Sequence, residues 1–201
     1  AGKTCLFNTL NDLDGFRLIM KDSNNLFSSL NNNAKSIRGY DNGDHGIPFP
    51  TPEIFKLPLF DDEKSITTYW AGSLLIVLKN ALKQDAEFAN MFRKYVTEEI
   101  YQLLTIDNLL DPTKWVDLLN SSPELWEKTL YHTDIYLQQL SQTIYITYDY
   151  LDRVSTEYNR LFPFIRSLLS FWYTRNSRWK RIHCKIFLRT DLFDNSLMLQ
   201  F

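Results

Sequence analysis

Side chains alternate between two faces of the chain from residue 143 to residue 148. Isoleucine and tyrosine occupy one face, and threonine and tyrosine occupy the other. A period of two in β-branched and aromatic residues predicts a β-strand. Asp149 follows at the carboxyl end of this strand, where ligands bind in an open α/β sheet. A second apolar run, residues 182–188, is expected to lie parallel to the first.

Between residues 64 and 142, apolar residues recur every three or four positions, which predicts an all-helical segment. The acidic residues at 61–63 suit the start of its first helix. Pro112 and Pro123 each follow a capping residue and suit the first position of a helix. The expected helices span residues 65–83, 88–104, 115–119, 125–130 and 134–140.

The amino-terminal part of the chain has a less regular pattern. Residues 4–10 have the spacing of a helix, and residues 16–20 are a candidate strand. Residues 22–46 are rich in Asn, Ser, Asp and Gly, which favour turns, and four prolines between 48 and 58 oppose regular structure beyond them. Residues 22–60 are therefore expected to form an irregular surface loop.

The first four residues carry a phosphate-binding pattern. Ala1-Gly2-Lys3-Thr4 matches the end of the loop sequence G-x-x-x-x-G-K-[ST], and apolar residues with helical spacing follow. In such loops the backbone N–H groups cradle phosphates, the lysine reaches the terminal phosphates, and the threonine hydroxyl holds Mg²⁺. All four are candidate nucleotide-binding residues, and Thr4 is also a candidate metal ligand. Because the triplet Gly-Lys-Thr also arises by chance, it needs a second signal.

Asp149 supplies that second signal. A phosphate loop needs an acidic strand end to complete its metal site, and Mg²⁺ binds through one or two carboxylates plus phosphates. Asp149 is therefore predicted to be a metal ligand, the alternative being that it only caps the turn after its strand. The first glycine of the loop and the strand expected ahead of it do not precede Ala1. We expect either a domain cropped within the motif or an accidental match.

Three segments resemble one group of ATPases. The run D-Y-L-D-R at 149–153, after an apolar strand, is similar to the D-x-L-D-R Walker B region of KAP-type and STAND-like P-loop ATPases, which are relatives of AAA+ proteins. Residues 185–191 resemble the sensor strand of that group. The long interval between Lys3 and Asp149 is similar to the helical insertion of KAP-type members. The resemblance implies a P-loop NTPase-like parallel sheet flanked by helices, with a large all-helical insertion between Walker A and Walker B.

The resemblance also implies a division of the chain and a role for it. Residues 1–201 would form one incomplete P-loop NTPase domain, with an irregular loop at 22–60, a helical insertion at 64–142, and the Walker B and sensor segment at 143–201. The implied cofactors are ATP and Mg²⁺, although no base-reading motif separates ATP from GTP. The implied role is a conformational switch in a larger bacterial protein.

One departure from the group concerns hydrolysis. Many relatives have a water-activating acid directly after the Walker B aspartate, where this chain has Tyr150. Phenols are poor general bases at neutral pH, because their usual pKa is near ~10. Asp152 is the candidate substitute base, and Arg189 is a candidate sensor of the γ-phosphate. Whether the chain hydrolyses the nucleotide is left as two alternatives. Asp152 acts as the base, or it only forms a local ion pair with Arg153 and hydrolysis is slow.

Composition and charge limit the remaining classes. With 201 residues, of which 44% are hydrophobic and 23% charged, the chain is expected to form a globular domain. A net charge of −2 gives no general attraction to nucleic acid or to anionic membranes, so the basic run at 175–181 is interpreted as a solvated connection. The alternative is that this run contacts nucleic acid or the phosphates of a neighbouring subunit's nucleotide. No apolar run reaches the length of a membrane span. Cys5 and Cys184 lie in apolar contexts, which favours buried thiols in the cytoplasm.

Two function classes follow. The first is a nucleotide-binding P-loop NTPase, which would be an ATP hydrolase if it turns over. The alternative is a non-hydrolysing, nucleotide-gated interaction module, whose helical insertion at 64–142 binds a protein partner or another copy of the chain.

Overall fold

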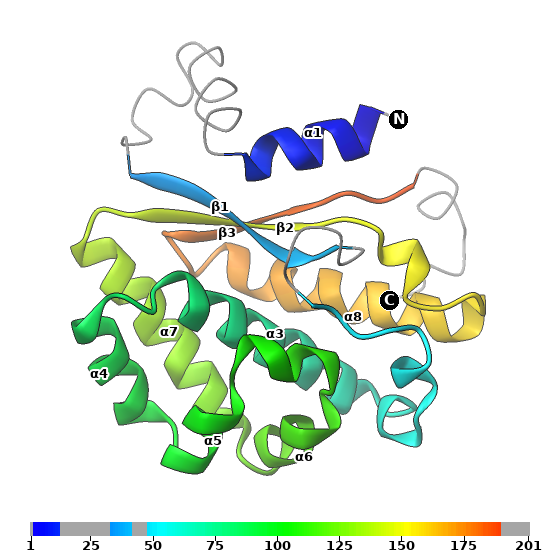
Figure 1. The fold of residues 1–201 in the computed structure, drawn as a ribbon, viewed down its shortest axis with the longest axis horizontal. Coiled ribbons are helices and arrows are strands. Elements are labelled where there is room, and N and C mark those ends of the chain that lie inside the picture. Colours follow the sequence, from blue (N-terminus) through cyan, green and yellow to red (C-terminus); the bar gives the residue numbers. More distant parts are fainter. Residues whose placement is uncertain (1, 13–32, 42–47, 190–201) are drawn as a thin grey trace.

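The chain folds into a mixed α/β structure in which helices flank a parallel sheet (Figure 1). The computed structural model describes residues 2–12, 33–41 and 48–189, without the side chains of residues 2–4 and 7. The expected fold class, α/β with a parallel sheet between helices, is confirmed at this level.

Within the described residues the sheet has three strands, in the order β1-β2-β3. They are β1 (Ala34–Tyr40), β2 (Thr143–Tyr148) and β3 (Ile182–Ile186). The central strand β2 pairs in parallel with both neighbours, with Ile146 opposite Ile37 on one side and Cys184 on the other. The alternating run at 143–148 and its predicted parallel neighbour are therefore confirmed.

β1 corrects the expectation of an irregular loop over residues 22–60. Its sequence is mostly polar, so it lacks the alternation that marks a half-buried strand, and pairing with β2 stabilises it instead. Gly39 permits this pairing, because a Cβ atom there would lie 2.5 Å from the Cγ2 of Ile146. The candidate strand at 16–20 lies outside the described residues. Farther along, residues 48–60 contain only short 3₁₀ turns, in keeping with their prolines.

Seven α-helices complete the described part of the chain. They are α1 (Gly2–Asn11), α3 (Glu63–Ala81), α4 (Ala86–Tyr95), α5 (Glu98–Leu103), α6 (Thr113–Ser121), α7 (Pro123–Gln139) and α8 (Tyr158–Asn176). The helical character of residues 64–142 is confirmed, but several boundaries differ. α6 begins at Thr113, with Pro112 as its N-cap residue instead of in the predicted first helical position, and two of the expected divisions between helices change.

The helix expected over 88–104 is two helices. Two residues separate them: the extended backbone of Val96 ends α4, and the Thr97 Oγ1 accepts a hydrogen bond from the N–H of Ile100 as the cap of α5. Conversely, the short helices expected over 125–130 and 134–140 are one helix, α7, which starts at Pro123 in the predicted first position.

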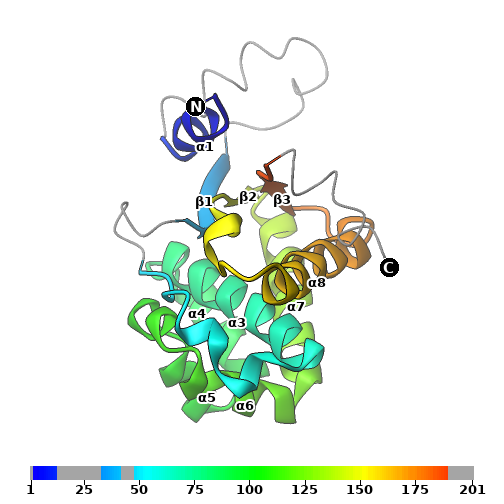
Figure 2. The same cartoon turned by 90° about the vertical axis from the view of Figure 1, so that its right-hand side faces the viewer.

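The helices lie on both faces of the sheet. Figure 2 shows α1 on one face and α3, α7 and α8 on the other, with α4, α5 and α6 farther from the strands. The core lies between the sheet and α3, where thirteen α3 residues are buried. Trp70 is fully buried there and donates from Nε1 to the carbonyl of Phe164 in α8 at 3.0 Å. The edge of its ring faces Tyr148 of β2 at 5.9 Å between centroids, so one aromatic residue joins α3, α8 and the sheet.

The two cysteines differ from the expectation of buried thiols. Cys5 is exposed on α1, because that helix covers the sheet from the outside, and Cys184 is partly buried on β3. Burial raises the pKa of the Cys184 thiol to about 12, which keeps it protonated at neutral pH.

Candidate functional site

The carboxyl ends of the strands form the candidate site. β1 ends at Tyr40 and is followed by Asp41, and β2 ends at Tyr148 and is followed by Asp149. Because the strands are parallel, both carboxylates lie at the same end of the sheet. The N–H of Asp149 donates to the carbonyl of Tyr40 at 3.1 Å, which continues the pairing of the two strands to this edge.

Helix α1 begins towards the same end of the sheet. Its last residue, Asn11, donates from Nδ2 to the Thr147 Oγ1 at 2.8 Å and accepts at Oδ1 from the Ser36 hydroxyl at 3.2 Å. α1 runs opposite to β2, with its amino-terminal end above the side where β2 ends (Figure 1). Given the rise per residue of a helix and of a strand, Thr4 lies roughly 10 Å beyond Asn11 and Asp149 roughly 7 Å beyond Thr147. The two backbones therefore reach a similar level along the sheet.

The other predicted phosphate-binding residues are described only in part. Gly2, Lys3 and Thr4 form the first turn of α1, so their backbone N–H groups belong to a helix N-terminus. Their side chains, and the whole of Ala1, lie outside the described residues. The contacts of the Lys3 ammonium group and of the Thr4 hydroxyl therefore stay predictions.

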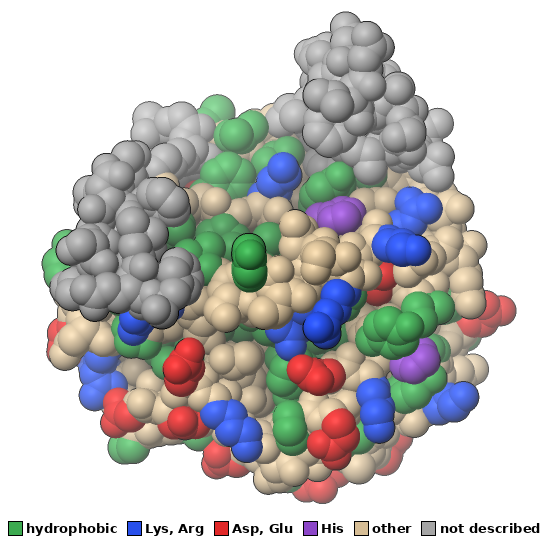
Figure 3. Space-filling view, turned by 180° about the vertical axis from the view of Figure 1, so that it is seen from behind, with side chains coloured by type: hydrophobic (Ala, Val, Ile, Leu, Met, Phe, Trp, Pro, Cys, Tyr) green, Lys and Arg blue, Asp and Glu red, His purple; other side chains and the backbone are tan. Residues whose placement is uncertain are grey.

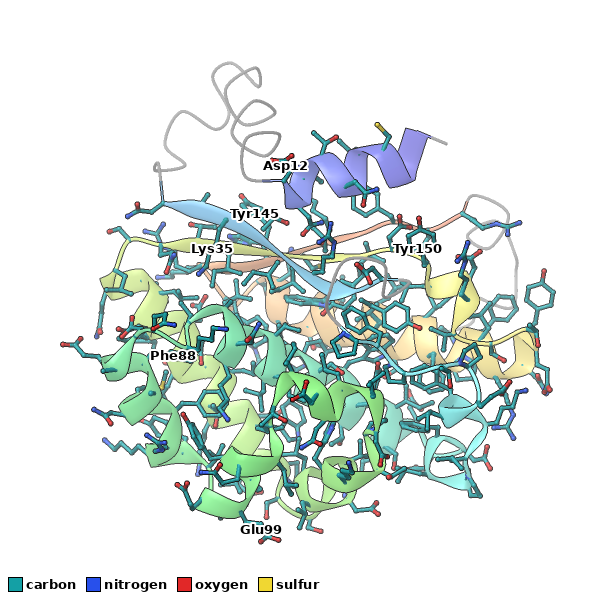
Figure 4. All side chains as sticks on the ribbon, viewed as in Figure 1. Asp12, Lys35, Phe88, Glu99, Tyr145 and Tyr150 are labelled. Carbon is teal, nitrogen blue, oxygen red and sulfur yellow. The ribbon has the colours of Figure 1, made fainter. Side chains whose placement is uncertain are left out.

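Asp149 is held by the turn that follows its strand. Only 8% of the residue is exposed, and its Oδ1 accepts a hydrogen bond from the N–H of Tyr150 at 2.8 Å. Tyr150 has a φ of 57° and a ψ of 22°, a left-handed conformation that costs a bulky residue energy. Figure 4 places Tyr150 at this end of the sheet. Oδ1 of Asp149 therefore caps the turn, which was the alternative role expected for this residue. Capping by one oxygen does not exclude metal binding, because a carboxylate has two oxygens.

Asp152 and Arg189, the two candidate catalytic residues, contact each other. Arg189 Nη1 lies 3.4 Å from Asp152 Oδ2, and the two side chains are 61% and 30% exposed. The pairing follows from the topology, since Arg189 follows β3 and Asp152 lies in the turn (Leu151–Arg153) after β2. The expected alternative, an ion pair between Asp152 and Arg153, does not form. Instead, the Arg153 guanidinium lies over the Tyr150 ring, 4.7 Å from its centroid.

The sequence analysis did not identify three residues near this edge, Arg38, Tyr40 and Asp41. Asp41 is 2% exposed, and its Oδ2 lies 3.2 Å from the Arg38 Nε. Burial raises the pKa of the Tyr40 phenol, and the nearby carboxylates of Asp41 and Asp152 raise it further. All three residues belong to β1 or follow it, so their place in the site depends on a strand that the sequence pattern does not reveal.

The residues at this edge fit a cation that binds together with phosphate. Among residues 2–12, 33–41 and 48–189, no group of three or more His, Cys, Asp and Glu side chains could hold a metal ion. Mg²⁺ bound to a nucleotide does not need such a group, because phosphates and water supply most of its oxygen ligands. One buried carboxylate at a strand end, Asp149, suits that coordination.

Within the basic run at 175–181, Arg175 and Arg181 contact the rest of the protein, whereas Arg178 and Lys180 are exposed. Arg175 Nη2 lies 3.2 Å from Glu127 Oε1, and its guanidinium lies over the ring of Phe171, 4.1 Å from the centroid. Arg181 donates from Nη1 to the Thr143 Oγ1 at 3.2 Å. Seen from behind, Lys and Arg side chains are dispersed among Asp and Glu on the described surface (Figure 3). These contacts agree with the interpretation of this run as a connection between α8 and β3.

Two further observations concern the whole chain. Among the described residues, no helix has both the length and the apolar character needed to cross a membrane. Comparisons with protein-family models, with curated proteins and with solved structures find no match for this chain.

Proposed function

We propose that this chain binds Mg-ATP at the carboxyl edge of its sheet and acts as a P-loop NTPase switch. The observation that supports this most directly is an arrangement of three parts. A helix that begins with Gly-Lys-Thr covers a parallel sheet, its start faces the carboxyl ends of the strands, and the central strand ends in a buried aspartate. Helix N-termini at that edge of an α/β sheet bind phosphate in many nucleotide sites.

In this proposal each site residue contacts a different part of the Mg-ATP ligand. Gly2 and the first turn of α1 hold the phosphates through backbone N–H groups, and Lys3 neutralises the terminal phosphates. Thr4 and Asp149 bind Mg²⁺, which bridges the phosphate oxygens. Arg189 senses the γ-phosphate, and Asp152 holds Arg189 while the site has no nucleotide.

The resemblance to KAP-type and STAND-like ATPases assigns a role to the helical segment. Residues 64–142 would be the insertion between the Walker A and Walker B regions. Its first helix, α3, contacts β1, α6, α7 and α8, so it belongs to the core of the domain. We propose that the outer helices α4, α5 and α6 carry the contacts to a protein partner or to another copy.

Replacing Lys3 with alanine is expected to weaken ATP binding by about 10- to 100-fold, because a charge-assisted hydrogen bond to phosphate contributes about 1.5–3 kcal/mol. The affinity would be measured by calorimetric titration of Mg-ATP. Lys64→Ala is the matched control, since Lys64 is an exposed lysine in the first turn of another helix, α3. Equal affinities for the Lys3→Ala and Lys64→Ala proteins, or no ATP binding by the unchanged chain, would contradict the proposal.

Replacing Asp152 with asparagine is expected to tighten ATP binding about two- to fivefold, because Arg189 is then no longer held by a carboxylate in an exposed pair worth about 0.2–1 kcal/mol. Arg189→Gln is expected to weaken binding and to cancel the effect of Asp152→Asn in the double variant. If Asp152 is instead the hydrolytic base, Asp152→Asn leaves the affinity unchanged and removes phosphate release.

The alternative function is a nucleotide-gated interaction module without hydrolysis. Tyr150 favours it, since this residue takes the place of a water-activating acid. Phosphate release from Mg-ATP separates the two functions. Release that is lost in Lys3→Ala supports the NTPase, whereas ATP binding without release supports the module.

A further inference from the structure

The side chain of Asn11, in the last turn of α1, connects this helix to two strands. Its Nδ2 donates to the Thr147 Oγ1 of β2 at 2.8 Å, and its Oδ1 accepts from the Ser36 hydroxyl of β1 at 3.2 Å. The Thr147 hydroxyl hydrogen can be donated to the Asn11 Oδ1 at 3.1 Å or to the Ile37 carbonyl of β1 at 3.3 Å. We call this set of bonds the Asn11 clasp. It requires one side chain that both donates and accepts, which an amide does.

The Asn11 clasp lies in a buried part of the interface between α1 and the sheet. Thr147 is 0% exposed, and Leu10, which precedes Asn11, is 8% exposed. Because water has little access there, a lost bond leaves a polar group unpaired inside the protein. Asn8 lies one turn nearer the start of α1 on the same face, and its buried Oδ1 has no hydrogen-bond partner among the described residues. Asn8 therefore offers a matched comparison for Asn11.

The Asn11 clasp is close to Asp149 but far from the start of α1. Thr147 precedes Asp149 by two residues, roughly 7 Å along the strand. Gly2 is nine residues before Asn11, roughly 14 Å along the helix, so a rotation of α1 by roughly 10° about Asn11 would move its first-turn N–H groups by about 2 Å. Binding groups must be held to within about 0.5 Å of their productive geometry. The orientation of α1 at Asn11 therefore decides whether its first turn and Asp149 can meet one ligand.

We propose that Asn11 is a positioning residue of the nucleotide site, a role that rests on the function proposed above. Through Thr147 it holds the first turn of α1 in place relative to Asp149, so that one Mg²⁺ can bridge phosphates bound at α1 and the carboxylate at the end of β2. Asn11 itself contacts neither the nucleotide nor the metal. It therefore acts on the part of the ATP affinity that depends on Mg²⁺.

The first test is a calorimetric titration of the whole chain with ATP, once with Mg²⁺ and once with EDTA. The ratio of the two affinities measures the contribution of the metal. Asn11→Leu and Thr147→Val are each expected to lower this ratio by about tenfold, as the loss of a group that orients a metal ligand does. A variant that is only less stable has less active protein in both titrations, and its ratio does not change. Thr147→Val keeps the β-branched shape and removes only the hydroxyl, so it serves if Asn11→Leu does not fold.

Two control variants carry the same substitutions outside the Asn11 clasp. Asn8→Leu changes an asparagine on the same face of α1 whose Oδ1 makes no hydrogen bond among the described residues. Thr143→Val changes a threonine of β2 whose hydroxyl accepts from Arg181. Both controls are expected to keep the Mg²⁺ ratio of the unchanged chain.

The second test measures the position of α1 without nucleotide. Cys5 is exposed on α1, whereas Cys184 is partly buried and burial raises its pKa to about 12, so a thiol-directed nitroxide label attaches to Cys5. In the unchanged chain the label is expected to broaden the N–H signal of Asp149 more than that of Thr143, which lies roughly 20 Å away along β2. Asn11→Leu and Thr147→Val are expected to reduce this contrast, because α1 is then free to rotate.

The two tests separate this proposal from the function on which it rests. The positioning role is overturned if Asn11→Leu and Asn8→Leu have the same Mg²⁺ ratio, or if the broadening by the label is the same in Thr147→Val as in the unchanged chain. If the unchanged chain binds no ATP while Asn11→Leu and Thr147→Val move the label, the function proposed for the site is wrong, whereas the control of α1 by Asn11 stands.

Discussion

An Asp134→Ala protein is expected to lose about 3 kcal/mol or more of its free energy of unfolding, because each buried backbone donor that is left without an acceptor costs about 1–3 kcal/mol. Asp134 is 2% exposed on α7. Its Oδ1 accepts from the N–H groups of Arg181 at 2.7 Å and Ile182 at 3.0 Å, and both its oxygens lie 3.1 Å from the N–H of Lys180. Without the carboxylate, three backbone donors at the start of β3 lose their acceptor inside the protein.

Urea unfolding monitored by circular dichroism would measure this loss. Asp134→Asn is expected to fall between alanine and aspartate, because an amide has one acceptor oxygen and presents N–H groups to donors. Asp117→Ala is the control, since Asp117 is an exposed aspartate within another helix, α6. A loss in Asp134→Ala no larger than in Asp117→Ala would show that the α8–β3 junction does not depend on this carboxylate.

The role of Asp134 shows which part of the fold could be predicted. β2 and α3 were predicted because their own residues carry the period of the element, and burial follows that period. The acceptor of three N–H groups at 180–182 lies more than forty residues earlier in the sequence, and no local pattern connects the two. β1 was missed for the same reason, because its stability comes from pairing with residues 143–148.

The candidate site shows a similar division. The position of Asp149 could be predicted, because a strand pattern ends directly before it. The contact between Asp152 and Arg189 could not, since it requires β2 and β3 to be neighbours and their following turns to converge. Tyr150 was identified as a chemical departure from the KAP-type and STAND-like ATPases that this stretch resembles, but its left-handed backbone has no signal in the sequence, where glycine or asparagine would be expected.

Replacing Gly72 with alanine is expected to lower the free energy of unfolding by about 2 kcal/mol or more, even though alanine favours a helix by about 1 kcal/mol over glycine. Gly72 lies within α3, where α6 packs against it. A Cβ atom there would lie 2.1 Å from the Cζ3 of Trp115 and 2.9 Å from the Cδ1 of Leu119, far inside van der Waals contact. Trp115 cannot move aside easily, because it is 1% exposed and its Nε1 donates to the carbonyl of Asn108.

A double-variant cycle tests this cause directly. Trp115→Leu alone is expected to destabilise the protein by leaving a cavity between α3 and α6. In the Gly72→Ala/Trp115→Leu protein the new methyl group occupies part of that space, so the combined loss in the free energy of unfolding is expected to be smaller than the sum of the single losses by about 1 kcal/mol or more. Additive losses would mean that the indole ring of Trp115 is not what excludes a side chain at position 72. The interface between α3 and α6 would then accommodate a methyl group there without displacing Trp115.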